Sequence, residues 1–584
     1  MAVIVASCWG LGQAVLSRAA APARRDRWLE WGMATSLGLG LLVMAMQALG
    51  LVGALQRVPV LCLLAAGVIA AALQFPGWRR QAFTAPPVLT LVDRYALVGL
   101  VLALLPTLSA PLAPPVTYDE IMYHLPYARQ VAESGRLGVY EWLRYPWFPY
   151  NYDLLYAAVL QVYDDVFPHL VHALAGWLSV LVIYRLGLMY ANRLAACMGA
   201  AIWLFMGQYD NAYIDMAVSL FVLVAFVALW WWRDAEAPDR GVRWLAMAAF
   251  FLGLAAGSKY QSLTFLPVVG LIVIVRERRP QVWLLAIGCF LLPCIYWYAR
   301  NAVMTGDPFN PLGAHLFGFT NWNQADYQNQ LVDVQENHAN PPNGVLWAVL
   351  LAPFGEVVRR SRAARGAMLF CGWSLLVWVV TSRYPRYLAP ALPLIALMAA
   401  VGWHQLGLWI RGAWRKRSAA GVDVVSVPAS RLEIGLGKAA GVVAIVLLGA
   451  ACVYHSARNI REISPTAESR EAFFRRHIAG YDVLHFLRQH PIEGKTYQVM
   501  LNDSLYFGPD LMYGDVFGPW RYADFIMLPP DQLARKLRAQ DFGTIVIKTA
   551  LAPYIHTQPD FDRHFRLLLE KDGVRAYRIL PIAP

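Results

Sequence analysis

The chain has 584 residues, of which 58% are hydrophobic and only 15% are charged. Soluble globular chains have roughly 45–50% apolar and about 25% charged residues, so a soluble enzyme, a nucleic-acid-binding protein and a disordered scaffold are excluded. The net charge of +12 comes from arginines that lie in short clusters between apolar runs, where membrane topology accounts for them. We therefore expect a polytopic membrane protein.

Apolar runs and arginine clusters alternate along the chain as far as residue 456. Runs such as residues 37–55, 96–112 and 212–232 approach or exceed the roughly 18 apolar residues that span a bilayer. Arginine-rich loops favour the cytoplasmic side, and the apolar runs between the clusters come in pairs. This pattern predicts about fourteen transmembrane helices with both termini on the outer side.

One apolar segment, residues 244–275, is too long to cross the membrane once. As a single helix its roughly 32 residues would reach about 48 Å, whereas the hydrocarbon core is roughly 30 Å thick. We expect it to fold back at Gly257-Ser258-Lys259-Tyr260, close to the outer surface.

The C-terminal part has a different composition. From Thr466 onward, helical patterns (477–489 and 531–540) alternate with short strand patterns (496–501, 544–547 and 575–580). A small extramembrane α/β domain of roughly 120 residues is predicted. The fold class is thus mainly α, with this domain at the C-terminus.

Two adjacent acids, Asp119 and Glu120, directly follow a predicted transmembrane helix on the outer side. Adjacent carboxyls raise each other's pKa, and burial raises it further toward the range that a general base needs. We expect Asp119 to be that base, although a pair of solvated acids is the alternative. Asp215 opens a later apolar run, where a functional acid and an acid that stabilises the helix N-terminus are equally well supported.

Several cations are also expected on the outer side. Lys259 is the first lysine of the chain and lies in the predicted turn; its compact ammonium suits a phosphate, and a snorkelling lysine is the alternative. Arg383 and Arg386 are expected on the outer side, although arginines favour the cytoplasmic side, so they would need a compensating anion. Arg300 is a further cation on the outer side.

The first outer loop is rich in aromatic residues, from Tyr140 to Tyr152. Their flat faces suit sugar rings, but an aromatic belt at the membrane interface is the favoured interpretation. The cysteines lie in or beside apolar runs without metal-ligand spacing, so no metal site is predicted, and a requirement for a divalent metal is left open.

A series of short motifs resembles the GT-C glycosyltransferases, in particular the branch with the protein O-mannosyltransferases and the lipid A aminoarabinose transferase. The motifs are Tyr118-Asp119-Glu120, Tyr127-Ala128-Arg129, Tyr213-Ile214-Asp215, Gly257-Ser258-Lys259-Tyr260, Arg300-Asn301 and Arg386-Tyr387-Leu388. The resemblance covers roughly residues 97–401. It divides the chain into additional N-terminal transmembrane helices (1–93), a catalytic transmembrane domain (94–456) with outer loops 113–168 and 300–344, and a periplasmic α/β domain (457–584).

The resemblance implies a polyprenyl-phosphate sugar donor, inversion at the anomeric carbon and an active site on the periplasmic face. Asp119, Glu120 and Asp215 are then catalytic, and Lys259, Arg300, Arg383 and Arg386 bind the donor phosphate. His124 and Arg129 are assigned to substrate binding in the loop.

The sequence thus predicts a hexosyl or pentosyl transferase in the bacterial inner membrane, acting on a glycan, lipid or protein acceptor and using no nucleic acid. One alternative is an oligosaccharide ligase or polymerase with a diphosphate-linked donor. A second is a transporter or lipid flippase, which would show inverted repeats and polar groups near the middle of the membrane. We find no repeat in the sequence, and the polar groups gather at one surface.

Overall fold

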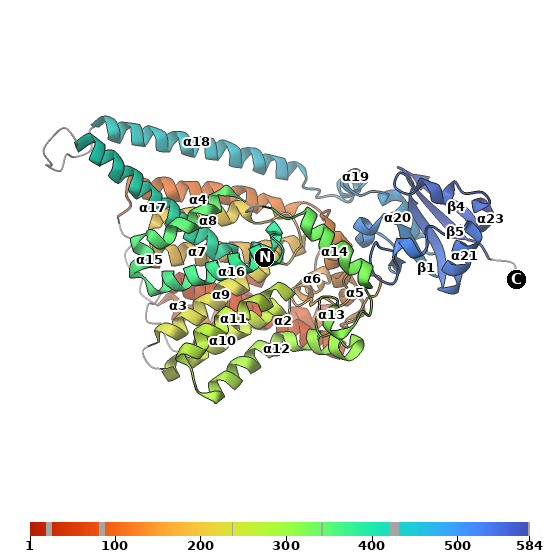
Figure 1. Ribbon diagram of the computed structural model, residues 1–584, viewed down its shortest axis with the longest axis horizontal. Coiled ribbons are helices and arrows are strands. Elements are labelled where there is room, and N and C mark those ends of the chain that lie inside the picture. The colour runs from red at the N-terminus through yellow and green to blue at the C-terminus, as the bar shows by residue number, and fades with distance from the viewer. Residues whose placement is uncertain (19–25, 81–87, 236–237, 340–342, 420–430, 582–584) are drawn as a thin grey trace.

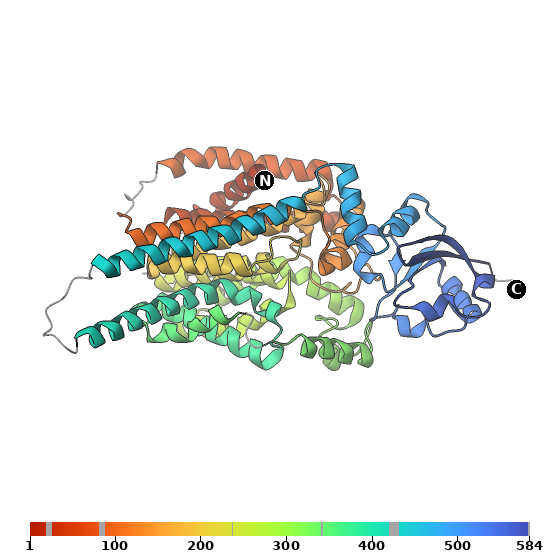
Figure 2. The ribbon, with the colours of Figure 1, turned by 90° about the horizontal axis from the view of Figure 1, so that it is seen from above.

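The computed structural model describes residues 1–18, 26–80, 88–235, 238–339, 343–419 and 431–581. Long helices run side by side in a bundle, and a small α/β domain lies at one end of the long axis (Figures 1 and 2). The predicted fold class is confirmed: a mainly helical polytopic membrane protein with a C-terminal α/β domain.

In the part of the chain that the structure describes, nine helices are long and apolar enough to cross a membrane, and five apolar helices are shorter. The predicted fourteen spans require every short helix to cross as well, so that total stays a prediction. The long helices are α2 (Arg27–Val52), α3 (Arg57–Arg79), α4 (Leu91–Ser109) with η1 (Ala110–Leu112), α7 (Phe167–Tyr190), α9 (Asp215–Asp234), α12 (Pro280–Thr305), α16 (Arg362–Thr381), η5 (Pro385–Ala391) with α17 (Leu392–Ala419), and α18 (Arg431–Arg461).

The other helices of the membrane part are mostly shorter. They are α1 (Ala2–Leu16), η2 (Glu120–His124), α5 (Leu125–Ser134), α6 (Asp153–Leu160), α8 (Arg193–Met206), α10 (Pro238–Ala256), η3 (Tyr260–Phe265), α11 (Leu266–Arg276), α13 (Ala314–Phe317), α14 (Gln324–Glu336), η4 (Gly344–Phe354) and α15 (Glu356–Arg360).

The N-terminal helices α1, α2 and α3 pack closely because small residues face each other. A Cβ atom on Gly12 would lie 1.7 Å from the carbonyl oxygen of Ala34, and one on Gly38 would lie 1.7 Å from that of Cys8. Close backbone approach of this kind is how transmembrane helices gain packing energy without a hydrophobic driving force.

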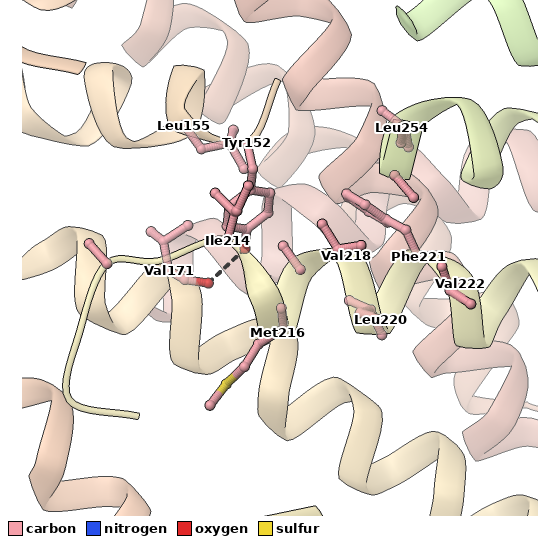
Figure 3. Close-up of a cluster of buried hydrophobic side chains, with 14 of the residues drawn as sticks. Tyr152, Leu155, Val171, Ile214, Met216, Val218, Leu220, Phe221, Val222 and Leu254 are labelled. Carbon is pink, nitrogen blue, oxygen red and sulfur yellow. Dashed lines mark hydrogen bonds between the residues drawn. The ribbon is translucent and has the colours of Figure 1, made fainter. Parts of the chain in front are cut away.

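Helix α9 forms the centre of the bundle. Its apolar window is buried throughout, so neighbouring helices surround it on all sides. Figure 3 shows the start of α9, with Met216 and Phe221, packed beside Tyr152 and Val171, whose carbonyl accepts a hydrogen bond from the Tyr152 hydroxyl (2.8 Å). This packing fixes the position of Asp215, the first residue of α9.

The predicted fold-back of residues 244–275 is confirmed. Helix α10 ends at Ala256, and the chain returns through η3 and α11. A Cβ on Gly257 would lie 2.1 Å from Nδ2 of Asn151, whose backbone N–H donates to the Gly257 carbonyl (3.0 Å). The turn that carries Lys259 is therefore held against the first outer loop.

The C-terminal domain contains a five-stranded mixed sheet in the order β2-β1-β3-β5-β4. Strand β1 pairs in parallel with β2 and β3, and β5 pairs antiparallel with β3 and β4. The three predicted strands correspond to β1, β3 and β5, whereas β2 and β4 were not predicted. The elements are α19 (Ala467–His477), α20 (Tyr481–Gln489), β1 (Lys495–Val499), η6 (Asn502–Phe507), β2 (Met512–Tyr513), η7 (Tyr522–Asp524), α21 (Pro530–Ala539), β3 (Phe542–Lys548), α22 (Pro553–His556), α23 (Phe561–His564), β4 (Phe565–Lys571) and β5 (Val574–Ile579).

Candidate active site

Asp119 lies just before η2, a single π-helical turn that leads into α5. Its carboxylate forms a salt bridge with the Arg386 guanidinium and accepts a hydrogen bond from the Tyr123 hydroxyl (3.1 Å). The backbone N–H of Asp119 donates to the Tyr213 hydroxyl (3.4 Å). Single π turns occur often at functional sites, because the extra residue changes the direction of nearby side chains.

Arg386 joins Asp119 to Asp215. Its Nε lies 2.7 Å from Oδ2 of Asp215, and its Cζ lies 4.2 Å from the centre of the Tyr213 ring. Lys259 Nζ lies 2.6 Å from Oδ1 of Asp215. We call Asp119, Asp215, Lys259 and Arg386 the ionic cluster; its side chains are between 8% and 21% exposed, so it is reachable from solvent.

The predicted rise in the pKa of Asp119 is wrong. Burial raises the pKa of this carboxyl, but the Arg386 guanidinium outweighs burial and holds the pKa below its ordinary value of 3.8. The neighbouring acid and burial are visible in the sequence around Asp119, whereas Arg386 is 267 residues away along the chain.

Glu120 points away from the ionic cluster and is fully buried. It forms a salt bridge with His169 of α7, accepts hydrogen bonds from the N–H (3.1 Å) and hydroxyl (2.8 Å) of Thr117, and accepts one from the N–H of Ala212 (2.9 Å). Burial raises the pKa of the Glu120 carboxyl, but His169 and Thr117 bring it below the ordinary value. Glu120 therefore ties the loop of Asp119 to the segment that leads to Asp215.

Three other predicted site residues lie outside the ionic cluster. His124 pairs with Asp153 at 2.7 Å, and both side chains are buried. Arg129 donates to the backbone oxygen of Tyr506 in the C-terminal domain (2.6 Å). Arg300 donates to Oδ1 of Asn301 (2.9 Å) and lies against the ring of Trp297. Each of them supports the outer loops.

Arg383 lies in the segment that leads to η5, in a left-handed backbone conformation with a φ of 52°. Its backbone N–H donates to the Trp378 carbonyl (2.9 Å), and its own carbonyl accepts from the Ala339 N–H (3.0 Å). The residue therefore shapes the chain just before Arg386.

Tyrosines complete the site and were not predicted. Tyr123 and Tyr213 contact Asp119, and the Tyr387 ring centre lies 5.9 Å from Lys259 Nζ. A signal existed for each: Tyr123 is four residues after Asp119, and the other two are close in sequence to Asp215 and Arg386.

The interpretation of the loop aromatics as a membrane-interface belt is wrong for most of them. Trp142, Trp147, Tyr150 and Tyr152 are buried within the protein. Tyr150 stacks on Tyr127 with 3.9 Å between ring centres. The aromatic residues therefore form the core of the outer loop.

The C-terminal domain covers this loop. Arg144 forms a bidentate salt bridge with Asp515 (2.7 Å), and Arg521 forms one with Asp326 at the start of α14 (2.8 Å). Asn502 donates to the hydroxyl of Tyr118, the residue before Asp119 (3.0 Å). The ionic cluster therefore lies at the end of the bundle that faces the domain, as Figure 1 shows for α5 and α6. Within the described ranges, no group of three or more His, Cys, Asp or Glu is placed to hold a metal ion.

Residues 177–282, which include Asp215 and Lys259, match the family model of the protein O-mannosyl-transferase TMEM260 N-terminal domain. For these residues the match confirms the resemblance to the protein O-mannosyltransferase branch. Residues 469–578 of the C-terminal domain match a second model, described as SF2091/S2213.

Two curated relatives come from Shigella flexneri. The uncharacterized protein SF2092/S2214 is 27% identical over 141 residues, which are 22% of this chain and 76% of the relative. The uncharacterized protein SF2093/S2215 is 43% identical over 70 residues, which are 12% of this chain and 35% of the relative.

Solved structures of similar architecture share little sequence with the chain. ArnT from Cupriavidus metallidurans bound to undecaprenyl phosphate has a TM-score of 0.48 and 17% identity, over 84% of this chain and 98% of that one. The Archaeoglobus fulgidus oligosaccharyltransferase tethered with an acceptor peptide has a TM-score of 0.47 and 11% identity, over 84% and 74%.

Proposed function

We propose that the chain transfers a monosaccharide from a polyprenyl-phosphate donor to a hydroxyl group of an acceptor. The observation that carries this proposal is the ionic cluster: two carboxylates and two cations, partly exposed, at one end of an apolar helical bundle. A lipid-linked phosphate has an apolar tail that suits the bundle and an anionic head that suits the cations.

Lys259 and Arg386 bind the donor phosphate in this proposal. Asp215 forms a salt bridge with each of them, at 2.6 and 2.7 Å, and keeps their side chains in place. A phosphate that gains charge as the sugar leaves is stabilised by cations that are already positioned. Arg383 and Arg300 support the backbone and the outer loops around these cations.

Asp119 acts as the general base once the donor is bound. The phosphate competes with Asp119 for the Arg386 guanidinium, which removes the cause that holds the pKa of Asp119 low. The acceptor hydroxyl then gives its proton to Asp119 while its oxygen attacks the anomeric carbon. The bond from that carbon to the phosphate oxygen breaks, the electron pair leaves with the polyprenyl phosphate, and the configuration inverts.

Glu120 acts as a positioning residue, because both of its carboxylate oxygens already accept hydrogen bonds within the fold. His124 supports the same loop through Asp153, and Arg129 fixes the C-terminal domain on it.

We also propose that the ionic cluster and the C-terminal domain lie on the periplasmic side of a bacterial inner membrane. Helices α7, α9 and α11 begin near the cluster and carry Arg185, Arg233 and Arg276 at or near their far ends. This distribution agrees with the rule that arginines favour the cytoplasmic side.

A donor comparison with the purified chain in lipid vesicles tests the proposal. Undecaprenyl monophosphate and undecaprenyl diphosphate carrying the same labelled hexose or pentose are supplied in parallel with a membrane extract as acceptor. We expect label to be transferred from the monophosphate. Transfer from the diphosphate alone would establish a ligase or polymerase, and movement of intact donor across the membrane without transfer would establish a flippase.

A further inference from the structure

A cavity with apolar walls lies between the N-terminal helices α1, α2 and α3 and the helices α6 and α7. Its volume is about 280 Å³, well above the roughly 150 Å³ of an apolar cavity that holds a benzene molecule. We call it the lateral cavity. Every side chain that lines it is apolar except that of Tyr163, and the walls include Leu42, Met46, Val60, Leu64, Ala158 and Val171.

The lateral cavity opens on a side of the bundle that faces the bilayer. Leu42 and Ala158 in its inner wall are 2% and 4% exposed, whereas Leu61 and Val3 at its rim are 41% and 57% exposed. Helix α3, which carries Leu61, has only 17% of its apolar window buried within the protein. Hydrocarbon therefore surrounds the rim. Because water does not fill an apolar cavity, a hydrocarbon chain is the occupant that these walls favour.

The cavity lies close to the end of the bundle that carries the outer loops. The segment before α3 is held against the first outer loop: the Leu55 N–H donates to the Gly135 carbonyl (3.1 Å), and the Gln161 side chain donates to the Leu55 carbonyl (2.6 Å). Helix α3 then begins at Arg57, and Leu61 of the cavity lies about one turn further along it. The head group of a lipid whose chain enters the cavity thus reaches the membrane surface.

Arg57 supplies a cation next to the cavity. Residues three and four positions apart share one face of a helix, so Arg57 lies on the same face of α3 as Val60 and Leu61. Its side chain is exposed and has no ion-pair partner within the described ranges. Arginines favour the opposite end of the bundle, so this position is compensated best by an anion from outside the chain. A lipid phosphate is such an anion.

The polyprenyl tail of the donor has less support as the occupant, because α6 and α7 separate the lateral cavity from the ionic cluster. On α6, Ala158 lines the cavity, whereas the hydroxyl of Tyr156 donates to the Tyr213 carbonyl beside the cluster. On α7, the His172 ring accepts a hydrogen bond from the Met216 N–H at the start of α9 (3.2 Å). A donor with its phosphate on the two cations of the cluster would have to pass its tail around both helices.

We propose that the lateral cavity binds one acyl chain of a phospholipid from the surrounding leaflet, with the phosphate of that lipid on Arg57. The chain fills the space between the N-terminal helices and α6, and so holds α6 where Tyr156 supports the segment before Asp215. The N-terminal helices, which the resemblance to glycosyltransferases does not cover, form one wall of this lipid site. Binding of the lipid does not depend on the proposed transfer reaction.

Native mass spectrometry measures this binding without any transfer. The purified full-length chain is freed of lipid in detergent and titrated with phosphatidylglycerol, and we expect one tightly bound lipid per chain. Ala158→Trp and Leu42→Trp, which fill the cavity from two different helices, should remove the tight binding. Arg57→Gln should weaken the affinity about tenfold, because a charge-assisted hydrogen bond to the phosphate is lost. R57Q changes only the surface, so the test remains decisive if a filled variant does not fold.

Two variants on α18 are the matched controls. Ala444→Trp adds the same bulk at an exposed alanine, and Arg461→Gln removes an exposed arginine at the end of that helix. Both should bind phosphatidylglycerol as the parent does, and the thermal midpoint in detergent shows which variants are folded. Parental affinity in R57Q, or in a folded A158W or L42W variant, would overturn the site.

Undecaprenyl phosphate, titrated in parallel, separates the two sources of a hydrocarbon chain. We expect A158W and L42W to bind it as the parent does, because its phosphate lies on the ionic cluster and its tail lies outside the lateral cavity. Loss of undecaprenyl phosphate binding in these variants, with phosphatidylglycerol binding retained, would assign the cavity to the donor tail and overturn the phospholipid site.

Discussion

Asp215 forms two salt bridges at once, with Lys259 at 2.6 Å and with Arg386 at 2.7 Å. Arg386 in turn reaches Asp119. The positions of the two cations are therefore coupled through one carboxylate, and a phosphate that binds one cation meets the other at the same time.

Replacing Lys259 by alanine should lower transfer by roughly 10²–10³-fold, because a preorganised charge at the leaving phosphate is lost. Lys259→Arg should recover part of the rate if only charge is needed, and little if the compact ammonium is required. The rates are measured with labelled polyprenyl-phosphate sugar. Lys438→Ala, an exposed lysine on α18, serves as the control. Parental rates in both Lys259 variants would identify it as a snorkelling lysine.

Replacing Arg386 by glutamine should change the pH dependence of kcat/KM. Arg386 holds the pKa of Asp119 below 3.8, so Asp119 should stay ionised in the parent as pH falls from 8 to 5. The kcat/KM of the parent should therefore be constant over this range. Without the guanidinium, burial raises the pKa of Asp119, and activity should fall at a higher pH than in the parent.

The pH profile of kcat/KM is measured for R386Q and for the parent, and each profile is scaled to its own plateau. Arg360→Gln, whose side chain is 80% exposed on α15, should keep the parental profile. An acid limb at the same pH in R386Q and the parent would show that Arg386 does not control Asp119.

The sequence indicated all members of the ionic cluster but not their pairing. Asp119, Asp215, Lys259 and Arg386 could be singled out because acids and lone cations beside transmembrane segments are rare. Arg386 is 171 residues from Asp215 and 267 from Asp119, and no local pattern encodes such contacts. The pKa shift of Asp119 was predicted in the wrong direction because the sequence does not show its contact with Arg386.

At the scale of elements, the start of the π-helical turn η2 directs the side chains of the two adjacent acids to different partners. Asp119 faces Arg386, whereas Glu120 is bonded to Thr117, Ala212 and His169. The Glu120–His169 pair connects the loop of Asp119 to α7. The pair therefore positions Asp119, although it is not part of the ionic cluster.

Breaking this buried pair should destabilise the protein by roughly 3–5 kcal/mol, because the remaining partner is left buried without compensation. We expect Glu120→Gln to lower the thermal midpoint in detergent, and the double variant E120Q/H169Q to lose less than the sum of the single losses. Glu133→Gln, with a half-exposed carboxyl, is the control. Additive losses in the double variant would contradict a direct interaction.

The Glu120–His169 pair also makes the stability of the protein depend on pH in a definite direction. Since the pKa of Glu120 is lowered in the fold, its contribution to stability is present above the ordinary pKa of 4.5 and is lost as pH falls through the lowered value. The E120Q variant should lack this loss.

Among the elements, the fold-back at Lys259 was predictable because helix length and bilayer thickness are fixed quantities. Strands β2 and β4 were missed for different reasons. Strand β2 is only two residues long, and β4 lies at an edge, where its mostly exposed side chains leave a weak pattern of alternation.

At the scale of the whole molecule, salt bridges and hydrogen bonds fix the C-terminal domain on the outer loops through Arg129, Arg144 and Arg521. The domain and Asp119 must therefore lie on the same side of the membrane. Such contacts join residues hundreds of positions apart, so the sequence predicted the domain but not its contact with the loops.

With the periplasmic orientation that we propose, this arrangement predicts that a cysteine in the domain reacts with an impermeant thiol reagent in cells whose outer membrane has been made permeable. Leu551→Cys is suitable because this side chain is 56% exposed, whereas Ser504 is buried at 1%. A cysteine at Ser504 is therefore the matched control and should label weakly. Labelling of L551C only after lysis of the inner membrane would reverse the topology.

The role of Asp119 as the general base is tested most directly by measuring the transfer of labelled sugar from undecaprenyl phosphate with the variant Asp119→Asn. Asp164→Asn, which changes an exposed carboxylate in the same loop, is the control. We predict that D119N loses roughly 10²–10⁴-fold in kcat, the usual contribution of a general base, while it still binds undecaprenyl phosphate. D164N should match the parent. Parental turnover by D119N would contradict the assignment of Asp119 as the base, and with it the proposed mechanism.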